Sequence, residues 1–224
     1  LVYAFFEFSI PIAFVMAAGQ ARRIMKLISN YWLGVLLYLV LAVMVAEIVR
    51  LILCLVQRKS IRKIHSEKLF VAVGAVCAMV IIVFSIWGII NARIIRLTPY
   101  EVIVDKSAGD LDSLNVVLIA DLHLGYNIGI THMTRMVELI NEQDADLVVI
   151  AGDIFDNEYE ALENPEKLAE ILNGIEAKYG VYACYGNHDI QEPILAGFTF
   201  GGEDGKSCSQ EMNQFMVKSD IRLL

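Results

Sequence analysis

The chain has few cysteines, and their spacing fits no thiolate motif. Its 224 residues include four, of which Cys54 and Cys77 fall in apolar runs while Cys184 and Cys208 fall in a more polar half. No spacing between them matches a zinc knuckle or a CxxC pair. The sequence therefore gives no indication of a cysteine-based metal or redox site, and its cysteines do not identify a redox compartment.

Acidic residues are scarce in the first 98 residues. That stretch holds 3 Asp and Glu against 11 Lys and Arg, whereas residues 99–224 hold 23 Asp and Glu against 7 Lys and Arg. The net charge of −8 thus combines a basic apolar half with an acidic half. This division predicts a membrane region at 1–98 and a water-soluble domain at 99–224. Because an acidic domain repels phosphate backbones, we expect no nucleic-acid partner.

Long apolar runs predict three transmembrane helices, at residues 1–18, 31–56 and 69–90. The third run has 22 residues without a charge, enough for a helix to cross the roughly 30 Å core of a lipid bilayer. In the second run, Glu47 and Arg50 lie three apart and can pair on one helical face. We favour that reading over a transport role, because intramembrane polar residues usually mark pathways only when several converge.

The basic residues of the loops predict the orientation of this multi-pass membrane protein. Residues 57–68 carry five Lys or Arg, whereas residues 20–30 carry three. Because basic loops tend to stay in the cytoplasm, we expect the richer loop there, although Arg93 and Arg96 dilute the bias. The domain that follows the third span is then expected on the extracytoplasmic side.

Short apolar runs separated by polar turns follow Pro99 and predict alternating strands and helices. We expect strands at 101–104, 115–120, 147–151 and from 181, with helices at 131–142 and 165–172. Thr131 and Asn164 are the expected helix caps. The alternation predicts a parallel sheet with right-handed crossovers, and the continuously apolar strands predict burial on both faces.

Polar residues stand directly behind three of these strands, as "DLH", "GD" and "GNHD". Parallel sheets bind ligands at the carboxyl ends of their strands, so three polar ends in succession predict one site. Taken singly, each motif can also be explained by a purely structural role, as a turn or as a loop histidine whose hydrogen bonds are made within the protein. Their oxygen and nitrogen donors, without a thiolate, suit Mn, Fe or Zn. If the chain stays extended, Asp121 and His123 should share one side.

The middle strand end offers a carboxylate that can bridge two cations. Asp153 has two oxygens, and each can bind a different metal ion. Two such ions lower the pKa of a shared water and hold the oxygens of an in-line displacement at phosphorus. Gly152 and Gly186 are expected to permit a close backbone approach, since neither has a Cβ.

The three blocks resemble those of a known family. "DLHLG", "GDIFDN" and "GNHD" look like the first three signature blocks of the calcineurin-like metallophosphoesterase superfamily, and the attached spans resemble its membrane-anchored bacterial members. The match covers residues 115–190. It implies N-terminal transmembrane α-helices followed by an α/β domain that forms the first half of a calcineurin-like α/β/β/α sandwich.

The resemblance also implies a role for each site residue. The expected metal ligands are Asp121 and His123 for the first ion, Asp153 as the bridge, and Asn187 for the second ion. By the same resemblance, His188 stabilises the transition state or protonates the leaving oxygen. Asp156 and Asp189 are expected to support that histidine.

The family pattern continues with a further histidine and a "GHxH"-like block, which this sequence lacks. Its four histidines are His65, His123, His132 and His188. His65 belongs to the basic loop, and His132 begins a helix where a solvated side chain is expected. Residues 213–224 read as a helix entering a strand that would open the second half of the sandwich. We therefore expect a catalytic domain that is incomplete at its C-terminus and a chain that is inactive by itself.

The leading functional hypothesis is a membrane-anchored, dinuclear-metal phosphoesterase. It would hydrolyse a phosphomonoester or phosphodiester by metal-activated water, using two divalent ions. The apolar helices favour a membrane-associated phosphoester substrate, such as a phospholipid-like compound or a lipid-linked pyrophosphate. The alternative is a catalytically incompetent metal-binding or interaction module on a membrane anchor.

Overall fold

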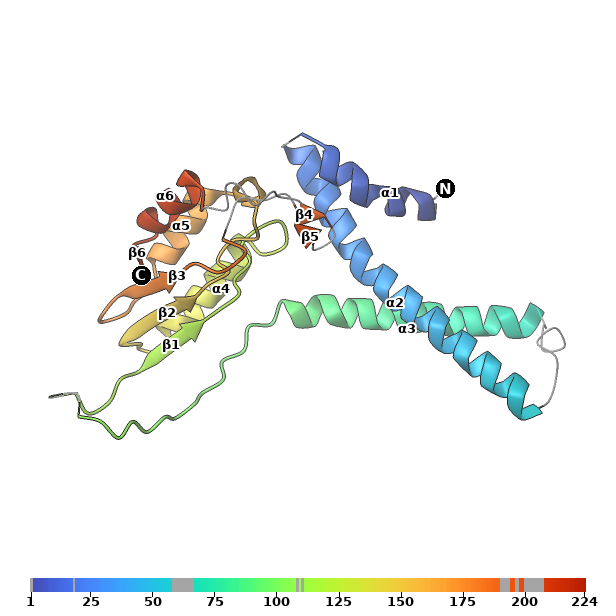
Figure 1. The fold of residues 1–224 in the computed structure, drawn as a ribbon, viewed down its shortest axis with the longest axis horizontal. Helices are drawn as coiled ribbons and strands as arrows, with labels where there is room; N and C mark the ends of the chain where they lie inside the picture. Colours follow the sequence, from blue (N-terminus) through green and yellow to red (C-terminus); the bar gives the residue numbers. More distant parts are fainter. Residues whose placement is uncertain are drawn as a thin grey trace. The chain divides into compact units, whose positions relative to one another are not determined.

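The structure is a computed structural model that describes most of the chain (Figure 1). The described residues are 2–17, 19–57, 67–107, 109, 111–189, 194–195, 198–199 and 208–224. They form two compact units, one from Leu1–Ser9 and Ile28–Ile94, the other from Ile10–Leu27 and Ile95–Leu224. Most of the basic loop at 57–68, including His65, lies outside the described residues.

Three apolar helices precede the α/β region. They are α1 (Val2–Val15), α2 (Gln20–Gln57) and α3 (Glu67–Ala92). The stretches Gln20–Val56 of α2 and Lys68–Ala92 of α3 are long and apolar enough to cross a membrane. With 14 residues, α1 is shorter than the about 20 residues that a span requires, so the predicted span at residues 1–18 stays a prediction.

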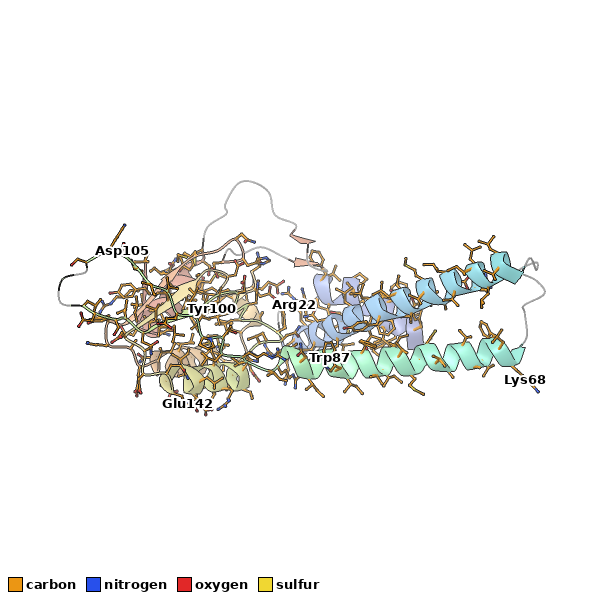
Figure 2. All side chains as sticks on the ribbon, turned by 90° about the horizontal axis from the view of Figure 1, so that it is seen from below. Arg22, Lys68, Trp87, Tyr100, Asp105 and Glu142 are labelled. Atoms are coloured by element: carbon orange, nitrogen blue, oxygen red, sulfur yellow. The ribbon has the colours of Figure 1, made fainter. Side chains whose placement is uncertain are left out.

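Aromatic and polar contacts join the helices of the first unit. Trp32 meets Phe6 with stacked rings whose centroids are 4.9 Å apart. Arg93 Nη2 donates to the Tyr31 hydroxyl at 2.9 Å. The predicted pair of Glu47 and Arg50 is confirmed, with 2.7 Å between their charged groups. Tyr38 of α2 also meets Phe84 of α3, with ring centroids 6.1 Å apart, while many other side chains of the two helices project outward (Figure 2).

A four-stranded parallel sheet organises the second unit. Its strands are β1 (Val116–Ile119), β2 (Leu147–Ala151), β3 (Val181–Cys184) and β6 (Ile221–Leu223), in the order β1-β2-β3-β6. The predicted alternation of strand and helix and the parallel pairing are confirmed. Short strands β4 (Ile194–Leu195) and β5 (Phe198–Thr199) pair separately. The fold class is therefore as predicted, with apolar helices followed by a partial α/β domain.

The strand order explains which face of the sheet is covered. Because the strands follow one another in chain order, right-handed crossovers place every connecting helix on the same face. These helices are α4 (Ile130–Asn141), α5 (Pro165–Asn173) and α6 (Gln210–Lys218), preceded by the short helix η2 (Tyr159–Ala161). Val148 and Ile150 of β2 are fully buried in the resulting core, with Phe215 of α6.

Three sequence-based expectations about the sheet are wrong. Burial on both faces is not found among the described residues, since Leu118 on the opposite face is 69% exposed. The run at 101–104 is not a strand. In addition, β6 does not open a second sheet, because Ile221 pairs with Val181 of β3 in the same parallel sheet.

The two helix caps differ from each other. Asn164 caps α5 as predicted, and its Oδ1 accepts the Lys167 N–H at 3.1 Å. Thr131 does not cap α4, because that helix begins one residue earlier with Gly129 as a cap without a side-chain bond. The predicted Thr131 cap is therefore wrong.

We expect Asn164→Ala to lower the free energy of unfolding by about 1 kcal/mol, because an N-terminal amide of α5 loses its acceptor. Thr131→Ala is the matched control and should change it by less than about 0.5 kcal/mol. Chemical denaturation of both variants measures the difference. An equal loss in the two variants would contradict the observed cap assignment.

Candidate metal centre

The chain beyond β1 stays paired with the chain beyond β2. Asp121 N donates to Gly152 O at 3.3 Å, and His123 N donates to Asp153 O at 2.9 Å. These bonds lie past the regular strand ends, where the backbone turns out of the sheet. They place the polar residues of "DLH" beside those of "GD", as expected from neighbouring parallel strands.

Four residues of this region hold a left-handed backbone. The φ angles are 53° at Asp121, 46° at His123, 50° at Asp153 and 59° at Asn157. Residues other than glycine rarely adopt this conformation, which Asn, Asp and His tolerate best. Such backbone strain concentrates at functional sites. The expectation that Asp121 and His123 lie on an extended chain is therefore wrong, although their side chains still reach one place.

Two groups of side chains can each hold a metal ion. Asp121, His123 and Asp153 offer ligand atoms that all lie within 4.8 Å of one another, and these are three of the predicted ligands. His123 also groups with Asp156 and His188 at the same spacing. The rings of the two histidines meet edge to face with centroids 4.9 Å apart. Imidazole nitrogens and carboxylate oxygens fit divalent ions such as Mn, Fe or Zn.

The loops after β2 and β3 meet at a contact that requires glycine. A Cβ on Gly152 would lie 3.0 Å from Gly186 Cα, and a Cβ on Gly186 would lie 2.5 Å from Asp153 N. The predicted close approach is confirmed. Across this contact, Asp153 Oδ1 accepts the His188 N–H at 2.8 Å, so one carboxylate touches the loop that carries His188.

The hydrogen-bond partner of His188 is a residue that the sequence analysis missed. Asn157 Oδ1 lies 2.5 Å from His188 Nδ1, and Asn157 N donates to His188 O at 3.1 Å. With its proton on Nδ1, His188 donates to Asn157 and keeps Nε2 for another partner. Asn157 is 0% exposed. A sequence signal did exist, because an Asn directly after "GDIFD" is a residue type suited to a left-handed turn.

The remaining predicted residues occupy three different settings. Asp156 Oδ1 lies 3.6 Å from His123 Nδ1. Asp189, 1% exposed, accepts the N–H of Phe155 at 2.8 Å and of Gly186 at 2.7 Å. Burial raises the pKa of Asp189, while these N–H donors act in the opposite direction. Asn187 is exposed between Gly186 and His188, and its role as a ligand stays a prediction.

Comparison with known proteins identifies the domain that carries these groups. Residues 114–220 match the family described as calcineurin-like phosphoesterase. Every donor described above lies inside that range. This part of the chain is similar to calcineurin-like phosphoesterases. Members of this family are phosphoester hydrolases that bind divalent metal ions, and the donor groups around His123 fit such ions.

Proteins similar to this chain include some that are named for a membrane location. The chain is 32% identical over 117 residues to a "Transmembrane protein with metallophosphoesterase domain" of Danio rerio, covering 52% of this chain and 26% of the relative. It is 28% identical over 127 residues to "UDP-2,3-diacylglucosamine pyrophosphatase LpxG" of Chlamydia trachomatis, covering 54% of this chain and 38% of the relative. The chain thus spans well under half the length of either relative.

We expect Gly186→Ala to weaken Mn²⁺ binding by at least about tenfold, because a Cβ there overlaps Asp153 and displaces a candidate ligand. Isothermal titration of the purified chain with Mn²⁺ measures the affinity. Gly34→Ala is the control, since a Cβ at Gly34 meets nothing within 4 Å. Unchanged affinity in Gly186→Ala would show that the glycine contact does not shape the ligand set.

Proposed function

We propose that the protein is a membrane-anchored phosphoesterase that uses two divalent ions to hydrolyse a phosphomonoester or phosphodiester with water. The observation that carries this proposal is the donor group of Asp121, His123 and Asp153, whose ligand atoms all lie within 4.8 Å of one another. The match of residues 114–220 to a phosphoesterase family supports the reaction class. The choice of Mn, Fe or Zn follows from the mixed nitrogen and oxygen donors.

The proposed ligands divide the two ions between the strand ends. Asp121 and His123 bind one ion, Asn187 binds the other, and Asp153 contributes an oxygen to each. Asp153 Oδ1 also accepts the His188 N–H, and the lone pairs that remain on the carboxylate are available to the ions. When bound, the ions supply a water of lowered pKa and neutralise charge on the phosphate oxygens.

We propose that the His188 side chain interacts with the phosphate group of the substrate. Its Nδ1 is engaged by Asn157, so Nε2 is the atom that can face the substrate. In its protonated form this ring stabilises negative charge at phosphorus or gives a proton to the leaving oxygen. Asp156 is proposed to orient His123, and Asp189 to hold the loop of His188 through two backbone N–H groups.

The proposed substrate is a phosphoester presented at a membrane, in the class of lipid-linked pyrophosphates. Two observations support it: the helices long enough to span a bilayer and the similarity to a relative named as a diacylglucosamine pyrophosphatase. A site on a membrane protein meets lipid-linked substrates at high local concentration, because both are confined to the same surface.

In the full-length protein, we expect Asp153→Asn to reduce metal-dependent hydrolysis of bis(p-nitrophenyl) phosphate by at least about a thousandfold. The substitution replaces one of the two carboxylate oxygens of the proposed bridge with an NH2 group, which cannot bind a metal ion. Thermal unfolding should show a retained fold. Asp112→Asn is the control, because Asp112 is exposed in a loop outside the donor groups. Retained turnover in Asp153→Asn would refute the assignment. Metal binding without turnover in the unsubstituted protein would favour the non-catalytic alternative.

We also propose a multi-pass arrangement with the phosphoesterase domain on the extracytoplasmic side. It rests on the Lys and Arg of residues 57–68 and on two helices that each can cross once. Two crossings return the chain to the side from which α2 started.

Labelling of a single cysteine tests this arrangement. We expect a membrane-impermeant maleimide to label Glu142→Cys in intact cells when the four native cysteines are replaced, because Glu142 is exposed at the end of α4. Permeabilised cells give the maximum signal as the control. Labelling that requires permeabilisation would place the domain in the cytoplasm.

A further inference from the structure

Glu158 is a buried carboxylate just beyond the residues that face the metal centre. It is 6% exposed, and its oxygens accept hydrogen bonds from three side chains. Arg22 Nη2 approaches at 3.0 and 3.2 Å, the Tyr126 hydroxyl at 2.9 Å, and Lys26 Nζ at 3.4 Å. A carboxylate buried this deeply is costly unless donors pair with it. The three donors therefore account for its position.

Two of the donors come from a distant part of the sequence. Arg22 and Lys26 lie 136 and 132 residues before Glu158, one turn apart near the beginning of α2, where Figure 2 labels Arg22. This beginning belongs to the same compact unit as Glu158. The candidate membrane span of α2 is Gln20–Val56, so both donors lie at its first turns. Because two crossings return the chain to one side, the proposed topology permits this contact.

Tyr126 adds a neutral donor and an aromatic surface. Arg23 and Lys26 lie over its ring, 5.9 and 5.7 Å from the centroid, and Arg23 also donates to Ala161 O at 2.6 Å. Burial and the nearby Glu158 raise the pKa of Tyr126, so its hydroxyl keeps the proton that it donates. The arrangement combines charge pairing, cation–π contact and burial in one place.

The segment that ends at Glu158 presents two groups to the site. Asp156 lies beside His123, and Asn157 Oδ1 meets His188 Nδ1. Asn157 holds a left-handed backbone, and its Nδ2 is buried without a partner in the described part of the chain. Both features cost free energy, so they persist only where the surroundings hold the residue in place. The fixed neighbour next along the chain is Glu158.

We infer that Glu158 is a positioning residue: clamped by Arg22, Lys26 and Tyr126, it holds Asn157 against His188. We call these four residues the Glu158 clamp. The clamp ties the geometry of the metal centre to the beginning of a candidate membrane helix. An effect on catalysis rests on the proposed function, whereas the effect on the Asn157 segment does not.

Hydrogen exchange measured by mass spectrometry on the full chain in nanodiscs tests the clamp. In Glu158→Gln we expect amides of residues 155–160 and 187–189 to exchange at least about tenfold faster, because breaking a buried ion pair loosens the segment that it holds. Tyr126→Phe, which removes one hydroxyl, should show a smaller increase in the same peptides. Glu138→Gln, which breaks an exposed pair with Arg135, is the matched control and should show none.

Unchanged exchange at 155–160 in both clamp variants would overturn the inference. If Glu158→Gln does not fold, Tyr126→Phe decides, because it retains the ion pairs. Steady-state kinetics add a second readout: we expect kcat to fall about ten- to a hundredfold in Glu158→Gln with KM within twofold. A change in KM alone would contradict a positioning role. Absence of turnover in the unsubstituted protein would refute the proposed function and leave the exchange result to decide the clamp.

Discussion

The parallel pairing of β1, β2 and β3 is the constraint on which the metal centre depends. Adjacent strands lie about 4.8 Å apart, so residues that leave β1 and β2 arrive at a spacing suited to shared metal ligands. A residue leaving β3 starts about 10 Å from β1. The contact between Gly152 and Gly186 removes this gap, because it lets the loop after β3 fold back until His188 meets His123.

Charge is the second constraint, since the site gathers several carboxylates in a small volume. Asp121, Asp153 and Asp156 stand around His123, and like charges this close repel unless cations neutralise them. Asp189 and Glu158 have different environments. Backbone N–H groups hold Asp189, and basic side chains hold Glu158. Carboxylates inside the domain are thus either candidate metal ligands or acceptors of hydrogen bonds that hold neighbouring segments in place. The hydrogen-bond donors around each carboxylate distinguish the two roles.

Local pattern was enough to predict the strands, the parallel sheet and the Asn164 cap. The strand at residues 147–151 was predicted to the residue, because an apolar run bounded by Asp146 and Gly152 leaves little choice. The Thr131 cap was wrong because Gly129, two residues earlier, also permits a helix to start. Single-face burial could not be read from composition, since it depends on strand order, which places all the helices on one side.

Within the site, the motifs predicted which residues lie close together. They did not predict the backbone conformation or the hydrogen-bond partners that hold these residues. Strand ends brought Asp121 and Asp153 together, whereas the left-handed backbone at His123 has no signature in a short motif. The resemblance implies a role for Asp156 and none for the neighbouring Asn157, so it did not predict the hydrogen-bond partner of His188. Two of the three partners of Glu158 lie more than a hundred residues away along the chain, and contacts of that range arise only when the chain is folded.

The left-handed backbone also restricts which residue types can replace Asp121, His123, Asp153 and Asn157. At these four left-handed positions the backbone conformation itself favours Asp, Asn, His or Gly over bulky or β-branched residues. Three of those four residue types are also metal ligands. Backbone sterics and coordination chemistry therefore favour nearly the same set of residue types. A lineage that lost its metal ion would still retain residues with metal-ligand atoms here. Gly186 is under a different constraint, because a Cβ there would overlap Asp153 whether or not a metal ion is bound.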